Sequence, residues 1–252
     1  MPAPVLPLRV HAAPGHESEA EALAARLGAS YGPGPARAAL VLTDAGLVAA
    51  SGDPDGHRDA AQLADGGLQV RFDEARRGAE PVVRAVRAAV ATDGRVVDAT
   101  AGLGADAGAL WRAGLRVTML ERDPVLAALL ADGLRRLREA DAPGHERLTL
   151  VEGDARERLA ALAWRPDVVY LDPMYPRARG GAKRRGAAWL RAWLGEPGAD
   201  PDEDARELLR VARRVARRRV VVKRPLRGPE LAPGVSGALR GTTTRFDLYP
   251  PG

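Results

Sequence analysis

The run Val168–Pro176 ends an apolar segment on a carboxylate, a proline and an aromatic ring, in the order Asp172, Pro173 and Tyr175. These residue types can hold a flat base that carries an exocyclic amine. The Asp172 carboxylate and the Pro173 carbonyl can accept the two N–H bonds of the amine, while the Tyr175 ring stacks on the base. A conjugated amine is a poor nucleophile, so paired acceptors that position it and favour proton loss suit this chemistry. A plain turn at the end of a strand would use the same residue types.

A second run, Val96–Asp106, is typical of a buried strand that leads into a glycine turn. Gly102 and Gly104 let the backbone turn sharply and approach a ligand at the carboxyl end of that strand. The spacing also fits the loose dinucleotide pattern, so the loop leaves a nicotinamide dinucleotide and S-adenosylmethionine both open. Glu121 can accept hydrogen bonds from the ribose hydroxyls of either cofactor.

Acidic residues around this loop favour S-adenosylmethionine. Asp98 and Asp106 suit a cationic sulfonium and its ammonium group better than a pyrophosphate. Asp154 follows a later predicted strand, where its carboxylate can either accept the adenine amino group or cap the next helix. Arg122 is either a cofactor contact or a solvated charge. The acidic pattern therefore indicates a nucleotide-like cofactor beside a base.

A basic, glycine-rich segment follows the Asp-Pro-Met-Tyr run, and Trp189 comes after it. We interpret it as a flexible loop beside the active site that contacts RNA phosphates, with a solvated charge run as the alternative. The formal net charge of +5 agrees with a polyanionic partner. The basic residues of the loop are Arg177, Arg179, Lys183, Arg184 and Arg185.

The elements that must position these residues alternate along the second part of the chain. Strands with continuous apolar character alternate with helices, which predicts a parallel sheet covered on both faces. The chain ends on a predicted hairpin, Ala238–Phe246, which is more typical of methyltransferases than of nucleotide dehydrogenases. The predicted strands are Arg95–Ala99, Arg116–Glu121, Leu148–Glu152, Asp167–Leu171 and Arg219–Lys223, and the predicted helices are Pro81–Ala91, Ala105–Ala113, Pro124–Arg138, Arg156–Ala163 and Asp202–Val215.

The first part of the chain predicts a small α+β unit. A helix is expected at Glu17–Leu27, with short strands at Pro7–His11, Ala39–Thr43 and Leu68–Phe72. We therefore expect two domains, a small amino-terminal α+β domain over residues 1–76 and a second domain over residues 77–252. We expect the second domain to have the α/β, Rossmann-like fold of class I methyltransferases that use S-adenosylmethionine.

Composition excludes several kinds of protein. The 252 residues include no cysteine, which rules out disulfides and cysteine-based metal sites, and the four histidines are scattered, so no metal is expected. No window approaches the roughly 18 to 20 apolar residues of a membrane span, and Met1 is followed by prolines rather than by a signal peptide. A cytoplasmic protein is expected.

Taken together, these segments resemble the ribosomal RNA small subunit methyltransferase J family over roughly Val96 to Tyr249. The resemblance implies methylation of guanine N2 in 16S ribosomal RNA with S-adenosylmethionine. It also implies cofactor contacts at Ala105, Asp106, Glu121, Arg122, Asp154, Ala155 and Asp172. The matching segments are Asp98–Gly104, Val117–Arg122, Val125–Leu134, Val168–Pro176, Val220–Pro225 and Arg245–Tyr249.

The chain also departs from that family pattern. Ala105-Asp106 stands where the family has Arg-Asp, and Asp154-Ala155 replaces a serine pair. The basic, glycine-rich segment before the first core helix is reduced to Phe72–Gly78. We expect remodelled contacts at these places.

Our leading hypothesis is a guanine-N2 methyltransferase that acts on 16S ribosomal RNA or the small ribosomal subunit. An adenine-N6 methyltransferase is the nearest alternative, because its substrate presents the same amine geometry to a similar Asp-Pro-x-Tyr strand end. A noncatalytic RNA-binding or ribosome-assembly factor is an alternative of another class. A nicotinamide dehydrogenase is disfavoured, because no paired His or Lys acid-base group accompanies the glycine loop.

Overall fold

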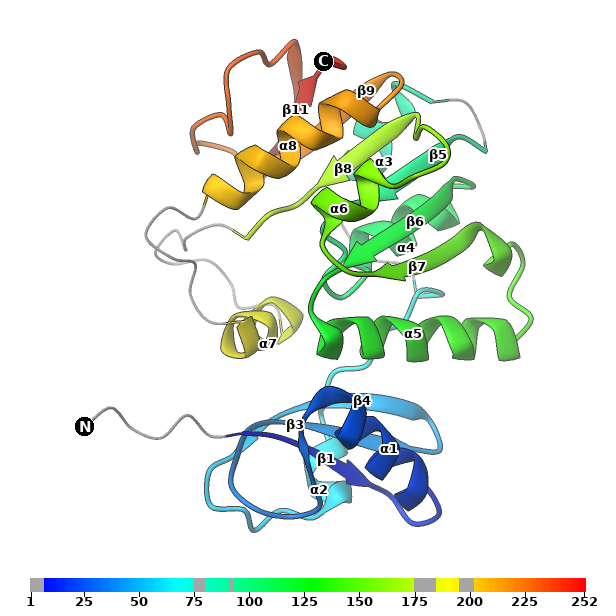
Figure 1. Cartoon of the computed structure of the whole chain (residues 1–252), viewed down its shortest axis with the longest axis vertical. Helices are drawn as coiled ribbons and strands as arrows, with labels where there is room; N and C mark the ends of the chain where they lie inside the picture. Colours follow the sequence, from blue (N-terminus) through cyan, green and yellow to red (C-terminus); the bar gives the residue numbers. More distant parts are fainter. Residues whose placement is uncertain (1–6, 75–79, 91–92, 175–184, 195–201) are drawn as a thin grey trace.

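The computed structural model describes residues 7–74, 80–90, 93–174, 185–194 and 202–252, which form two sheets with flanking helices (Figure 1). The smaller sheet has the order β2-β1-β3-β4. In it, β1 pairs parallel with β2 and β3, and β4 pairs antiparallel with β3. This amino-terminal unit contains β1 (Leu8–Ala12), α1 (Glu17–Leu27), β2 (Ser30–Tyr31), β3 (Ala36–Thr43), β4 (Gly46–Asp53) and α2 (Ala60–Ala64).

The larger sheet has the order β10-β11-β9-β8-β5-β6-β7. Strands β5 to β9 are parallel to one another, whereas β11 is antiparallel to both β9 and β10. The parallel α/β sheet with a terminal antiparallel hairpin is thus confirmed. Its elements are α3 (Glu80–Arg87), β5 (Arg95–Asp98), α4 (Ala105–Arg112), β6 (Arg116–Glu121), α5 (Pro124–Glu139), β7 (Leu148–Glu152), α6 (Ala155–Ala160), β8 (Val168–Leu171), α7 (Arg185–Leu194), α8 (Glu203–Val215), β9 (Arg219–Pro225), β10 (Gly237–Arg240) and β11 (Thr244–Tyr249), with a 3₁₀ turn at His145–Arg147.

The centre of the larger sheet places the two chemical runs side by side. β5 and β8 are neighbouring parallel strands, with Asp98 paired to Tyr170 in register. All four residues of β8 are buried, as expected for a strand covered by helices on both faces. Because parallel strands end at the same edge, the segments that follow β5 and β8 emerge together. The strand order reverses here, and sheets of this type bind ligands at such a point.

The start of helix α5 is fixed by a capping aspartate and a proline. The Asp123 carboxylate accepts hydrogen bonds from the backbone N–H groups of Val125 and Leu126, at 2.9 and 3.0 Å, and Pro124 occupies the first helical position. Figure 1 shows α5 lying between the larger sheet and the amino-terminal unit, where it contacts β4. The helix therefore supports both parts of the chain.

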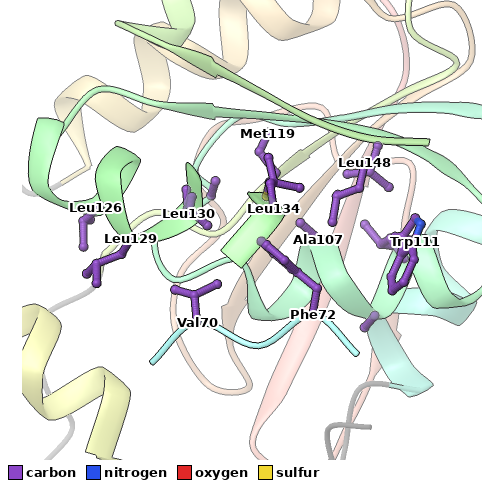
Figure 2. Close-up of a cluster of buried hydrophobic side chains, with 14 of the residues drawn as sticks. Val70, Phe72, Ala107, Trp111, Met119, Leu126, Leu129, Leu130, Leu134 and Leu148 are labelled. Carbon is purple, nitrogen blue, oxygen red and sulfur yellow. The ribbon is translucent and has the colours of Figure 1, made fainter. Parts of the chain in front are cut away.

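The predicted strand Leu68–Phe72 is wrong. Only Leu68 forms a bridge, to Ala49 of β4. Val70 and Phe72 instead point into the cluster formed with α4 and α5 (Figure 2) and are 4% and 2% exposed. The alternation of apolar residues thus reflects an extended segment with one buried side, and the segment does not join a sheet. One core cluster includes residues of both sheets.

Other elements also differ from the expectation. Strands β2 and β4 and helices α2 and α7 were not predicted, α6 ends at Ala160 instead of Ala163, and α3 ends at Arg87 instead of Ala91. After Arg87 the backbone N–H groups of Ala89 and Val90 bond to carbonyls three residues back, which tightens the chain out of the α-helix. The predicted domain boundary at residue 76 lies outside the described residues, so the division into two domains stays a prediction. In the described part of the chain, no helix is long and apolar enough to cross a membrane.

Candidate active site

Asp98 ends β5 and is 1% exposed. Its Oδ1 atom accepts a hydrogen bond from the backbone N–H of Thr100 at 3.1 Å. Burial raises the pKa of Asp98 to about 8, and the nearby negative charges of Asp106, Asp172 and Glu121 act in the same direction. The carboxyl group therefore sits in an environment that favours its neutral form unless a cation approaches.

This raised pKa predicts a pH-dependent stability. Asp98 binds a proton in the folded state up to about pH 8, whereas the unfolded chain loses it near its ordinary value of 3.8. The stability that the neutral group contributes is therefore complete below about pH 4 and is lost as the pH rises through 8. We expect the free energy of unfolding of wild type, relative to Asp98→Asn, to fall by about 4 kcal/mol between pH 5 and 8.5. Urea unfolding at both pH values measures it, and an unchanged difference would contradict the raised pKa.

The glycine loop after β5 is held to β6 by Glu121. The backbone N–H of Gly102 donates to Glu121 Oε2 at 2.8 Å, and the N–H of Asp123 donates to Oε1 at 2.9 Å. Burial raises the pKa of Glu121, while these hydrogen bonds oppose the rise. A carboxylate has about four acceptor sites, so Glu121 keeps capacity for further donors.

Both glycines have left-handed backbone angles, with φ of 55° at Gly102 and 71° at Gly104, where α4 begins. A Cβ atom at Gly104 would lie 2.6 Å from Phe72 Cε1 and 2.7 Å from Leu130 Cδ2. At Gly102 the nearest atom would be 3.9 Å away. Position 104 thus requires glycine for two reasons: the backbone is left-handed, and the Phe72 and Leu130 side chains leave no room for a Cβ atom.

Substituting the two glycines separates these requirements. Gly104→Ala is expected to cost about 1–2 kcal/mol for the left-handed backbone and about 1–3 kcal/mol more for overpacking. Gly102→Ala carries the backbone cost alone and serves as the matched control. Unfolding in urea measures both variants, and equal losses would show that Phe72 does not confine the loop.

A chain of polar contacts joins the ends of β5, β8 and β9. Tyr170 Oη donates to Asp106 Oδ2 at 2.8 Å. Lys223 Nζ lies 2.8 Å from Asp106 Oδ2 and 2.7 Å from Asp172 Oδ2. The backbone N–H of Asp172 donates to Thr100 Oγ1 at 2.6 Å, which ties the end of β8 to the glycine loop.

The sequence places Asp98, Asp106 and Asp172 at this edge, but its motifs indicate no role for Tyr170, Thr100 or Lys223. The position of Lys223 follows from the pairing of β8 with β9. Leu171 pairs with Val222, so the next residues, Asp172 and Lys223, lie side by side. A lone lysine at the end of an apolar strand, beside a strand that ends on an aspartate, is the pattern that finds it. In the described ranges, no group of three or more histidine and acidic side chains could hold a metal ion.

The comparisons with known proteins agree with this geometry. The model of the SAM-dependent methyltransferase family matches residues 24–251. A ribosomal RNA small subunit methyltransferase J from Thioalkalivibrio sulfidiphilus is 43% identical over 91% of this chain and 92% of its own length. Another from Alkalilimnicola ehrlichii is 42% identical over 76% of this chain and 77% of its own length. The chain belongs to the ribosomal RNA small subunit methyltransferase J family.

A SAM-dependent methyltransferase from Neisseria gonorrhoeae has the same fold, with TM-score 0.70, 30% identity and 96% of both chains covered.

S-adenosylmethionine is the cofactor of this methyltransferase family, and the residues at the sheet edge fit it. The glycine turn brings the backbone close to a ligand, and Glu121 keeps acceptor capacity for ribose hydroxyls. Asp98, Asp106 and Asp172 surround the turn with carboxyl groups, which suits a cation. Bound there, the cofactor supplies an electrophilic methyl group.

Three predicted cofactor residues lie farther along the same edge. Asp154 caps α6: its Oδ1 accepts the N–H of Arg156 at 2.8 Å, and hydrogen bonds from the Arg156 side chain lower the pKa of the carboxyl group. The capping alternative is thus observed, and the adenine contact stays a prediction. Ala155 is buried at the start of α6. Arg122 pairs at 3.3 Å with Asp204, and both side chains are exposed.

On the substrate side, the structure describes part of what was predicted. Asp172 and Pro173 follow β8 directly, whereas Tyr175, Arg177, Arg179, Lys183 and Arg184 lie outside the described residues. Placing Arg185 in a loop was wrong, because it is the first residue of α7. Trp189, Leu190 and Trp193 pack against the core, and this contact explains why the segment forms a helix.

Helix α7 contacts both parts of the chain. Trp189 Nε1 donates to the Ala50 carbonyl of β4 at 3.1 Å. Trp193 Nε1 donates to the Asp123 carboxylate at 3.1 Å, and the Arg37 guanidinium lies 4.5 Å from the ring centroid. The amino-terminal unit therefore helps to fix the helix that follows the substrate segment.

Proposed function

We propose that this protein transfers a methyl group from S-adenosylmethionine to the exocyclic N2 amine of a guanine in 16S ribosomal RNA. The observation that carries the proposal is the position of Asp172. Its carboxylate follows the central strand β8, and its backbone is hydrogen-bonded to the segment that forms the glycine loop. The relatives named ribosomal RNA small subunit methyltransferase J support the small ribosomal subunit as the partner.

The acceptor groups at the strand end have distinct tasks. The Asp172 carboxylate accepts a hydrogen bond from one N–H of the amine. It takes up that proton as the new N–C bond forms, while the bond between the methyl group and the sulfonium breaks and leaves a neutral thioether. The Pro173 carbonyl accepts the other N–H bond, which fixes the orientation of the amine. Tyr175 stacks on the base, and the proton then passes from Asp172 to solvent.

The cofactor contacts in this proposal follow the sheet edge. Glu121 accepts hydrogen bonds from the ribose hydroxyls. Asp98, Asp106 and Asp172 face the cationic part of the cofactor. Gly102, Gly104 and Ala105 supply close backbone contacts. Arg122, Asp154 and Ala155 complete the adenine side.

The basic residues after the strand end would bind the RNA backbone. Arg177, Arg179, Lys183, Arg184 and Arg185 are the residues proposed for phosphate contacts, which supply most of the salt-dependent affinity for nucleic acids. Ribosomal RNA as substrate places the enzyme in the cytoplasm.

The substrate class is tested by transfer of label from S-adenosylmethionine. The RNAs are unmodified 16S ribosomal RNA, unmodified 30S subunits, 23S ribosomal RNA and transfer RNA. We expect label to be incorporated only into 16S ribosomal RNA, either as free RNA or in the 30S subunit. Equal labelling of all four would contradict the specificity, and cofactor binding without transfer to any RNA would favour a noncatalytic binding or assembly factor.

A further inference from the structure

Lys223 occupies a place that the cofactor contacts do not explain. Its ammonium group lies between two carboxylates, 2.7 Å from Asp172 Oδ2 and 2.8 Å from Asp106 Oδ2. The side chain is 19% exposed, against 13% for Asp106 and 33% for Asp172. The lysine thus sits behind the aspartate that reaches toward the substrate.

The choice of lysine is itself informative. Lysines 183 and 223 are the only two in the sequence, although Lys and Arg together number 38. A compact ammonium group can fit between two carboxylates as a point charge, whereas a guanidinium is a planar fork. The position therefore uses the rare residue type where a compact cation is needed.

The neighbouring residue Arg224 shows what a structural ion pair looks like in the same strand. It is 2% exposed and forms a two-pronged contact with Asp202, with both N–O distances at 2.9 Å. This pair lies beside the start of α8. Lys223 instead contacts one aspartate of α4 and the aspartate at the end of β8.

We propose that Lys223 is a positioning residue for methyl transfer, whose ammonium group fixes the Asp172 carboxylate and keeps it ionised so that it can accept the N–H of the substrate amine. This inference rests on the proposed role of Asp172. Asp106 and Tyr170 act behind the lysine: Asp106 shares the ammonium group, and the Tyr170 hydroxyl donates to Asp106.

Electrostatics support a permanently charged lysine. Burial lowers the pKa of Lys223, but Asp172 and Asp106 raise it more, to about 12. Loss of the ammonium group would remove a positive charge that lies next to both carboxylates, and proton binding by one of them would become easier. Among the residues that the structure describes, the ionisable groups around this point are Asp98 of β5, Asp106 of α4, Glu121 of β6, Tyr170 and Asp172 of β8 and the following turn, and Lys223 of β9. Strand β11 presents Phe246 opposite Lys223, and its Asp247 pairs with Arg245.

The test compares pH profiles of kcat/KM for Lys223→Met, Lys223→Arg and Arg224→Met with that of wild type. We expect the acidic limb of Lys223→Met to move to higher pH by about 1–3 units, because an opposite charge next to a carboxylate has been removed. Lys223→Arg keeps the charge, so its limb should stay within about half a unit of wild type. Arg224→Met should lower stability and leave the limb in place.

Cofactor binding, measured by calorimetry without RNA, separates electrostatics from collapse of the site. Lys223→Met should bind S-adenosylmethionine as tightly as wild type or more tightly, since a cation has been removed beside a cationic ligand. If Lys223→Met does not fold, the pH profile of Lys223→Arg tests the inference instead. An acidic limb of kcat/KM displaced by more than one pH unit from that of wild type would overturn the inference. An unmoved limb in folded Lys223→Met, with Asp172→Asn inactive, would also overturn it while leaving the proposed function intact. Full activity in Asp172→Asn would instead refute the proposed function.

Discussion

Asp172→Ala is expected to lower kcat of methyl transfer by about 10²- to 10⁴-fold, the usual contribution of a positioned proton acceptor. The variant removes the carboxylate that accepts the amine proton. Its fold should survive, because the side chain is 33% exposed and Lys223 keeps its contact with Asp106. Single-turnover transfer to 30S subunits measures the effect, with circular dichroism as the check on folding.

Asp44→Ala is the matched control. It removes the same side chain from a position that is 99% exposed in the amino-terminal unit. We expect wild-type transfer from this variant. More than a tenth of wild-type kcat in folded Asp172→Ala would exclude the carboxylate as the proton acceptor.

Phe72→Ala is the substitution with the largest expected effect on stability. The ring is 2% exposed, and three glycines make room for it: Cβ atoms at Gly104, Gly108 and Gly133 would lie 2.6, 3.3 and 3.0 Å from its carbons. Figure 2 shows it beside Ala107 of α4 and Leu134 of α5. Truncating such a buried ring costs about 3–5 kcal/mol.

Equilibrium unfolding in urea measures the loss. Phe72→Leu keeps most of the apolar volume and should lose less than about 1.5 kcal/mol. Tyr31→Ala, at an exposed position of β2, is the surface control. A loss below about 1 kcal/mol in Phe72→Ala would mean that the ring does not anchor the extended segment on α4 and α5.

The larger sheet could be predicted from sequence because its strands are continuous apolar runs. Val168–Leu171 is a short apolar run of the kind found in strands covered on both faces, and the structure buries all four residues. Strand β4 was not predicted because it contains Ala49, Ala50 and Gly52, residue types that are depleted in strands. It forms through pairing with β3, which no local pattern reveals.

The candidate site divides in the same way. Asp98, Glu121 and Asp172 could be predicted because each directly ends or follows an apolar strand. Lys223 could be given a role only once the pairing of β8 with β9 placed it beside Asp172. The Leu68–Phe72 prediction failed because alternating burial against helices gives the same period as a strand.

The most direct test of the account is the identity of the methylated nucleoside. Unmodified 30S subunits and 16S ribosomal RNA are incubated with the protein and labelled S-adenosylmethionine, then digested and separated by chromatography with mass spectrometry. The account predicts label in N2-methylguanosine, and none when Asp172→Ala replaces wild type. Label in N6-methyladenosine would contradict the guanine assignment and establish an adenine-N6 methyltransferase.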